Sequence, residues 1–277
     1  MTAIALALGA SVCWGVGDFL GGFSSRRSSA LTVLAVAEVA GLAAIALFVA
    51  VRGIEPPGGA TFAFAAAAGV AGAVGLGALY RGMAVGAMGV VAPISATAAV
   101  IPVAFGLARG ERPSGLQLAG ISAALVGVAL ASREPGENAR LAAGVGLALV
   151  AAAGFGSYIV LIDEAAEAST EWAVLVSRGA ASVAAVSVSV ALALGRLRPR
   201  ARALPALAVI GLFDVGANGL LALALTRGLI SLVAVLSALY PVVTIALARA
   251  VLGERIGRIQ AAGAATALAG VALISIG

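Results

Sequence analysis

The sequence predicts an all-α integral membrane protein with ten transmembrane helices in two inverted five-helix repeats. Three observations lead to this fold: an apolar composition, ten long apolar runs and an internal repeat. Of the 277 residues, 62% are hydrophobic and only 10% are charged, whereas a soluble domain carries about 25% charged residues. So little polar surface excludes a water-soluble globule, and the composition also excludes disordered, collagenous and coiled-coil chains.

Ten apolar runs come close to the length of about 20 residues that crosses a bilayer core. In chain order, they are residues 2–23, 30–51, 61–80, 90–108, 116–132, 141–162, 172–194, 204–226, 231–250 and 259–277. Charges and helix breakers separate them, for example Arg26-Arg27 after the first run and Glu55–Gly59 after the second. The first run lacks a basic leader and carries Asp18, so we interpret it as a span and not as a signal peptide.

The two halves of the sequence resemble each other. Ala78-Leu79-Tyr80-Arg81-Gly82 returns as Ala224-Leu225-Thr226-Arg227-Gly228, and Gly110-Glu111-Arg112 returns as Gly253-Glu254-Arg255 at nearly the same offset. Five spans in each repeat make the second repeat enter the membrane from the opposite side. Inverted repeats are a common plan of secondary transporters, whose binding sites lie near the membrane midplane between the repeats.

The repeat sets the expected division of the chain. Residues 1–132 form the first five-helix repeat, residues 133–140 the inter-repeat loop, and residues 141–277 the second, inverted repeat.

Three short elements carry a resemblance to a known family. They are Trp14-Gly15 in the first span, Leu239-Tyr240-Pro241-Val242-Val243-Thr244 in the ninth, and Gly-Glu-Arg before the fifth and tenth spans. With the ten-span repeat, they resemble the EamA-type drug/metabolite transporters over the whole chain. The first repeat departs from the pattern, because Ala92-Pro93-Ile94-Ser95 and Pro102 replace its Tyr-Pro element. The resemblance implies transport of amino acids, sugars, nucleotide derivatives or drugs.

Charge in the loops bears on membrane orientation. The odd-numbered loops and their boundaries hold twelve arginines and the even-numbered loops hold four. The positive-inside rule then places both termini outside the cytoplasm, whereas the resemblance implies cytoplasmic termini. We favour the arginine count, in a multi-pass protein of a bacterial-type cytoplasmic (inner) membrane.

Ionisable residues within membrane spans are costly and are functional candidates by default. Four are present, Asp18, Glu38, Arg178 and Asp214, with Asn218 one helical turn beyond Asp214. Asp18 and Glu38 lie at similar depths on neighbouring spans, where two adjacent carboxylates would favour binding a proton. For Arg178, two interpretations stay open. It forms an internal ion pair with Asp214 or Glu38, or it contacts a substrate carboxylate while an acid binds a proton or a substrate amine.

Aromatic residues and prolines inside spans add further candidates. Trp14, Tyr158 and Tyr240 either line a pocket or pack in the core. Pro102 and Pro241 are predicted within spans four and nine, where each removes a helical hydrogen bond. They act either as static kinks or as hinges on which the repeats rock.

These features predict a secondary-active transporter, an exporter of small organic solutes such as amino acids, amine-bearing metabolites or drugs. It would work by alternating access, with proton coupling or exchange. The alternative is a sugar or nucleotide-derivative uptake carrier of the same fold. A channel, an intramembrane enzyme or a structural membrane subunit fits less well, since a scaffold needs no charge at mid-depth and no catalytic motif is present.

The expected partners are membrane lipid, a small-molecule substrate and protons. Neither a cofactor nor a metal is expected, because the chain has no His and one Cys, Cys13. Its arginines are scattered over short loops, which argues against nucleic acid. Ten helices can enclose a cavity alone, so the chain is expected to act as a monomer or a homodimer.

Overall fold

The computed structural model describes residues 2–25, 28–85, 94–131, 141–193, 201–252 and 257–277, and the regular elements in these ranges are helical. The longer helices of the first half are α1 (Thr2–Ser25), α2 (Ala30–Arg52), α3 (Gly59–Val85), α5 (Val100–Ala108) and α6 (Gly115–Ala131). Those of the second half are α7 (Leu141–Ala166), α8 (Thr170–Ala193), α9 (Leu204–Leu225), α10 (Ile230–Ser237), α11 (Tyr240–Leu252) and α12 (Arg258–Ile276).

Six helices are long and apolar enough to cross a membrane, and four shorter apolar helices accompany them within the described ranges. The six are Thr2–Ser25, Leu31–Arg52, Gly59–Gly82, Gly144–Ala166, Thr170–Val188 and Leu204–Leu225; the four are Ile94–Ala108, Gly115–Leu130, Ile230–Thr244 and Ala261–Ile274. Each overlaps one predicted run, so the all-helical fold is confirmed, with ten apolar helices of which six are long enough to span a membrane. The predicted inter-repeat loop, the Gly253-Glu254-Arg255 element and the arginines at 196, 198 and 200 lie outside the described residues.

Local sequence signals explain where the helices begin and end. Before α2, the Ser29 side chain accepts a hydrogen bond from the Thr32 N–H at 3.1 Å, which caps the first turn. After α2, Gly53 takes the left-handed conformation at φ 59°, which costs glycine little and lets the chain reverse. Pro205 lies in the first turn of α9, where its missing N–H is not needed.

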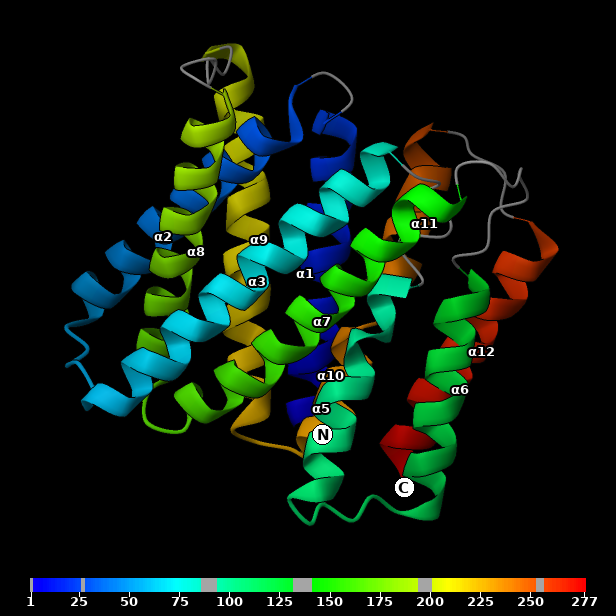
Figure 1. Cartoon of the computed structure of the whole chain (residues 1–277). Helices are drawn as coiled ribbons and strands as arrows, with labels where there is room; N and C mark the ends of the chain where they lie inside the picture. Colours follow the sequence, from blue (N-terminus) through cyan, green and yellow to red (C-terminus); the bar gives the residue numbers. More distant parts are fainter. Residues whose placement is uncertain (1, 26–27, 86–93, 132–140, 194–200, 253–256) are drawn as a thin grey trace.

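The helices pair symmetrically between the two halves (Figure 1). Helix α3 packs against α7 and α8, and its counterpart α9 packs against α1 and α2. Two further pairs join a helix to its own counterpart, α2 with α8 and α6 with α12, and α5 of the fourth span packs against α10 of the ninth. Two repeats related by a two-fold axis produce this pattern of contacts.

Glycine allows the closest of these contacts. A Cβ on Gly127 would overlap the Ala267 backbone, and one on Gly270 would stand 2.6 Å from the Ala124 nitrogen, so α6 and α12 touch backbone to backbone. A Cβ on Gly154 of α7 would likewise stand 2.7 Å from Gly75 of α3. The high glycine content therefore serves close helix packing, as is usual in membranes.

The fourth and ninth spans contain helix irregularities beside the prolines that were predicted within them. Helix α10 ends at Ser237 and α11 begins at Tyr240, and a 3-10 turn, η1 (Thr97–Ala99), precedes α5. Pro102 and Pro241 consequently stand in the first turn of α5 and α11 and not within a span's unbroken helix. The first turn leaves backbone N–H groups without helical partners, so proline is tolerated there.

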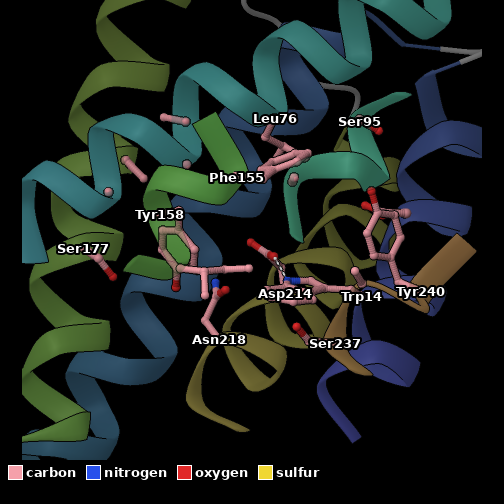
Figure 2. Close-up of a pocket in the computed structure, with 18 of the residues that line it drawn as sticks. Trp14, Leu76, Ser95, Phe155, Tyr158, Ser177, Asp214, Asn218, Ser237 and Tyr240 are labelled. Atoms are coloured by element: carbon pink, nitrogen blue, oxygen red, sulfur yellow. Dashed lines mark hydrogen bonds between the residues drawn. The ribbon is translucent and has the colours of Figure 1, made fainter. Parts of the chain in front are cut away.

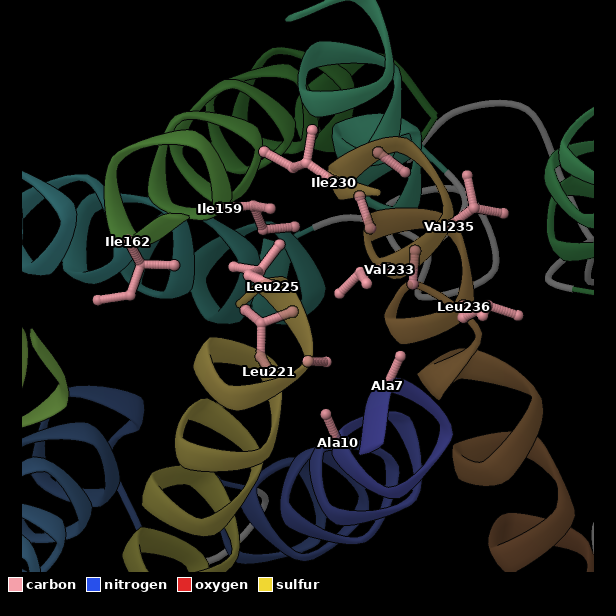
Figure 3. Packing of buried hydrophobic residues seen from close by; sticks show 14 of the residues in the cluster. Ala7, Ala10, Ile159, Ile162, Leu221, Leu225, Ile230, Val233, Val235 and Leu236 are labelled. Atoms are coloured by element: carbon pink, nitrogen blue, oxygen red, sulfur yellow. The ribbon is translucent and has the colours of Figure 1, made fainter. Parts of the chain in front are cut away.

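A large apolar cluster fills the half of the molecule nearest the two chain ends (Figure 3). Ala7 and Ala10 of α1 meet Leu221 of α9 and Val233 and Leu236 of α10, and these five side chains are essentially without solvent exposure. Since the cluster draws on helices of both repeats, it closes the space between them at this end.

Candidate functional site

A cavity lies between the two repeats, next to the apolar cluster. It contains about 820 Å³ of atom-free space, counting the part open to the outside. Side chains of α1, α2, α3, α7, α8, α9, α10 and α11 line it, as Figure 2 shows in part. The eight side chains predicted from the sequence all lie on its wall: Trp14, Asp18, Glu38, Tyr158, Arg178, Asp214, Asn218 and Tyr240.

Arg178 of α8 joins two carboxylates from different helices. Its Nη1 lies 2.6 Å from Glu38 Oε2 on α2 and 2.6 Å from Asp214 Oδ2 on α9. The Arg178 and Glu38 side chains are 4% and 3% exposed, and Asp214 is 22% exposed. Of the two interpretations of Arg178, the structure shows the internal ion pair, and it includes both candidate acids.

Close helix contacts bring these three charges together. A Cβ on Gly211 of α9 would overlap the Ala37 carbonyl of α2, and one on Gly41 would stand 3.0 Å from the Gly211 oxygen. On the other side, a Cβ on Gly69 of α3 would overlap the Ser177 carbonyl of α8. Small residues thus let α2, α3, α8 and α9 approach until the arginine reaches both acids.

Asp214 has a second partner on α1. The Trp14 Nε1–H donates to Asp214 Oδ1 at 3.0 Å, so the indole is fixed against the ion cluster (Figure 2). Asp18 follows Trp14 by one helical turn, which places both on one face of α1. Among the described residues, no hydrogen bond or ion pair engages the Asp18 carboxylate.

Asp18 and Glu38 do not form the isolated pair of carboxylates that the sequence predicts. Both line the cavity and an adjoining smaller hollow beside Tyr80. Glu38, however, is bonded to Arg178. The ion pair of Glu38 with Arg178 is one of the two interpretations that the sequence left open.

Two of the elements that carry the family resemblance touch each other beside the cavity. The Thr244 hydroxyl donates to the Gly15 carbonyl oxygen at 3.1 Å. A Cβ on Gly15 would stand 2.5 Å from Val243 Cβ and 2.8 Å from the Tyr240 oxygen, so only glycine fits here. This contact holds Trp14 and Tyr240 on neighbouring stretches of the wall.

The aromatic candidates combine both roles considered for them. Tyr158 is 8% exposed, belongs to the large apolar cluster and also lines the cavity. The sequence did not single out Leu76, Phe155, Ser95, Ser177 and Ser237 as site residues, although they also line the wall. Single serines and apolar residues in an apolar span give no signal of their own, although Ser177 adjoins Arg178.

Within the described ranges, no group of three or more His, Cys, Asp and Glu residues is arranged to hold a metal ion. What the arrangement does provide is an apolar, partly aromatic chamber with three carboxylates and one guanidinium on its wall.

Comparison with known proteins agrees with this architecture. The model of the EamA-like transporter family matches the chain twice, over residues 1–133 and 142–276. No curated protein matches the chain. Among the solved structures, 24 chains match. One, titled only as the crystal structure of a protein, superposes with a TM-score of 0.80 at 18% sequence identity, covering 99% of this chain and 96% of its own. That likeness shows the fold.

Proposed function

Because the chain belongs to the EamA-like transporter family, and is therefore a multi-pass membrane transporter of small solutes, we propose that it is a secondary-active exporter. Its solutes are small organic molecules that carry a positive charge, such as amino acids, amine-bearing metabolites or drugs. It works by alternating access across the cytoplasmic membrane. The observation that supports this proposal is the cavity between the repeats, with Arg178, Glu38, Asp214 and Asp18 on its wall.

The balance of charge in the cavity favours cations. Asp18, Glu38 and Asp214 bring three carboxylates, and Arg178 brings one guanidinium. Charges held away from bulk water need compensation, because their desolvation is costly. An organic cation or a proton entering this chamber supplies it. A neutral sugar does not, and a nucleotide derivative adds further negative charge, so the uptake carrier of such solutes is the weaker alternative.

The same acids offer a route to energy coupling. A carboxylate that binds either a proton or a cationic solute, but not both, exchanges one for the other across the membrane. The proposed energy source is therefore proton coupling or solute exchange, without a nucleotide or another cofactor. Membrane lipid surrounds the helices, and the chain acts as a monomer or a homodimer.

Alternating access is supported by the packing of the two halves. The apolar cluster closes the space between repeats at the end near the termini. Residues just before α5, among them Ser95 and Ala99, and the break between α10 and α11 line the cavity, and Pro102 and Pro241 follow these irregularities. Rocking of one repeat against the other, with these irregularities as hinges, would open the closed end and close the other.

The experiment is solute flux into proteoliposomes driven by a proton gradient, with the Asp214→Asn variant as the probe. Asp214 accepts from both Arg178 and Trp14, so its loss removes charge-assisted contacts worth a factor of about 10–100 in binding or rate. Asp163→Asn, the same substitution outside the cavity lining, is the matched control. Full flux in Asp214→Asn would remove this residue from the mechanism, and the absence of any coupled flux in the unmodified protein would overturn the proposed function.

A further inference from the structure

We infer that the solute is an organic amine cation without a carboxylate group, and that Asp18 is the residue that selects it. This inference rests on the proposed function, since it concerns the same cavity. It narrows the class of solute, because it excludes the zwitterionic amino acids that the composition of the cavity wall alone would admit.

The charge cluster around Arg178 disfavours a solute carboxylate. The Arg178 side chain is 4% exposed, and Nη1 is already shared by Glu38 and Asp214 at 2.6 Å each. The three groups together carry one net negative charge, which repels a further carboxylate. Nε of Arg178 is buried without a partner among the described residues. Nη2 has no bonding partner among these residues either, so what disfavours a solute carboxylate is the net negative charge of the cluster and not a lack of N–H donors.

Asp18, in contrast to Arg178, has no bonding partner among the described residues. It lines both the cavity and the adjoining hollow. The other charged groups around this space are Asp214, Glu38 and Arg178. The guanidinium compensates one of the two carboxylates, so the three groups together keep one excess negative charge. An ammonium group beside Asp18 therefore meets an uncompensated carboxylate, with the excess charge of the cluster behind it.

The surroundings of Asp18 suit a cation with an apolar body. Trp14 lies one helical turn away with its indole fixed by Asp214, and Tyr80 borders the adjoining hollow. Aromatic faces attract ammonium groups. Beyond them, the wall continues with apolar side chains, among them Leu76, Phe155 and Ile159. Burial of an aromatic or alkyl body against this wall adds the hydrophobic part of binding.

The test compares ligands that differ only by a carboxylate. Phenethylamine against phenylalanine, and pentylamine against norleucine, are two such pairs, measured by thermal shift of the full chain in detergent. A ligand that binds only the folded state raises its apparent stability. Each amine is expected to bind more tightly than its amino acid by about tenfold or more, because the carboxylate meets net negative charge. Equal or tighter binding of the amino acids would overturn the inference and assign Arg178 to the solute.

Variants of Asp18 complete the test. Asp18→Asn is expected to lose about 10–100-fold in affinity for the amines, whereas Asp163→Asn keeps it. Asp18→Glu retains the charge and is expected to keep measurable binding, which separates loss of the site from loss of folding. Unchanged amine affinity in Asp18→Asn, or no amine binding at millimolar concentration, would refute this inference. Coupled flux of an amino acid in that case would leave the proposed function standing.

Discussion

Arg178 is the residue on which the charges of the cavity depend. Among the residues that the structure describes, it is the one basic side chain on the cavity wall, it is buried, and it bonds to acids from two other helices. Removing one member of a buried ion cluster leaves the others without compensation, and such changes cost far more than the loss of a surface pair.

Arg178→Gln is therefore expected to lower the free energy of unfolding by about 3–5 kcal/mol, since two carboxylates lose their common partner. Arg227→Gln, in an exposed loop position, is the matched control and is expected to stay within about 0.5 kcal/mol. Thermal and denaturant unfolding in detergent measures both.

A variant in which all three charges are removed tests this prediction further. Neutralising the acids as well, in Arg178→Gln/Glu38→Gln/Asp214→Asn, is expected to restore part of the lost stability because no buried charge of the cluster then remains. A single variant as stable as the unmodified protein would show that the cluster is not what holds α2, α8 and α9 together.

The candidate residues could be predicted because charges are conspicuous in an apolar sequence. Asp18, Glu38, Arg178 and Asp214 stand out from their neighbours, and all four reach one cavity. An ion pair of Arg178 with Glu38 or Asp214 was one of two predicted interpretations, but the joining of both acids to it could not be predicted, because it depends on how closely the helices approach. The approach of α2 to α9 is set by Gly211 against the Ala37 carbonyl, a contact between residues far apart in the chain.

At the scale of elements, α10 depends on a side chain from the other repeat. The helix has no side-chain cap of its own. Glu111, after α5, accepts the N–H groups of Ile230 and Ser231 at 2.6 and 3.1 Å. The neighbouring Arg109 lies 2.6 Å from Glu164 of α7. The segment that follows α5 is thus bonded to two helices of the second repeat.

Glu111→Ala is expected to lower the free energy of unfolding by about 1–2 kcal/mol, the usual cost of a lost helix cap. Glu111→Gln keeps one acceptor oxygen, so its cost should be smaller. Glu167→Ala removes an exposed glutamate nearby and serves as the control in the same unfolding measurement. Equal stability of Glu111→Ala and Glu167→Ala would show that the cap contributes nothing to the fold.

The broken helices show where prediction from hydropathy stops. The run at 231–250 is mostly apolar, and Ala238 and Leu239, where the helix is interrupted, are not helix breakers. Hydropathy records which segments avoid water but not whether their backbone is continuous. Pro241 gave a signal of irregularity, and the structure shows that the break precedes it.

At the scale of the whole molecule, the repeat seen in the sequence reappears as symmetric pairing of helices. The Gly-rich spans five and ten, which resemble each other in sequence, pack together as α6 and α12. The fold could be predicted because ten apolar runs and a duplicated pattern leave few other arrangements in a bilayer. Orientation could not be settled in the same way, because the arginine count and the family resemblance point in opposite directions.

The arginine count makes the end that carries the chain termini external. The apolar cluster closes that end, so in this orientation an exporter would receive its solute from the cytoplasmic side. Two single cysteines on opposite faces test it, in a Cys13→Ala background that removes the one native thiol. Gly58→Cys lies in the exposed loop after α2, and Ser28→Cys lies before α2 on the arginine-rich face.

A membrane-impermeant maleimide added to intact cells is expected to label Gly58→Cys at once and Ser28→Cys only after the membrane is permeabilised. Twelve arginines against four make this orientation the favoured one. The reverse pattern of labelling would place the termini in the cytoplasm, as the resemblance implies. The closed end would then be cytoplasmic, and the conformation described here would be the one from which an exporter releases its solute.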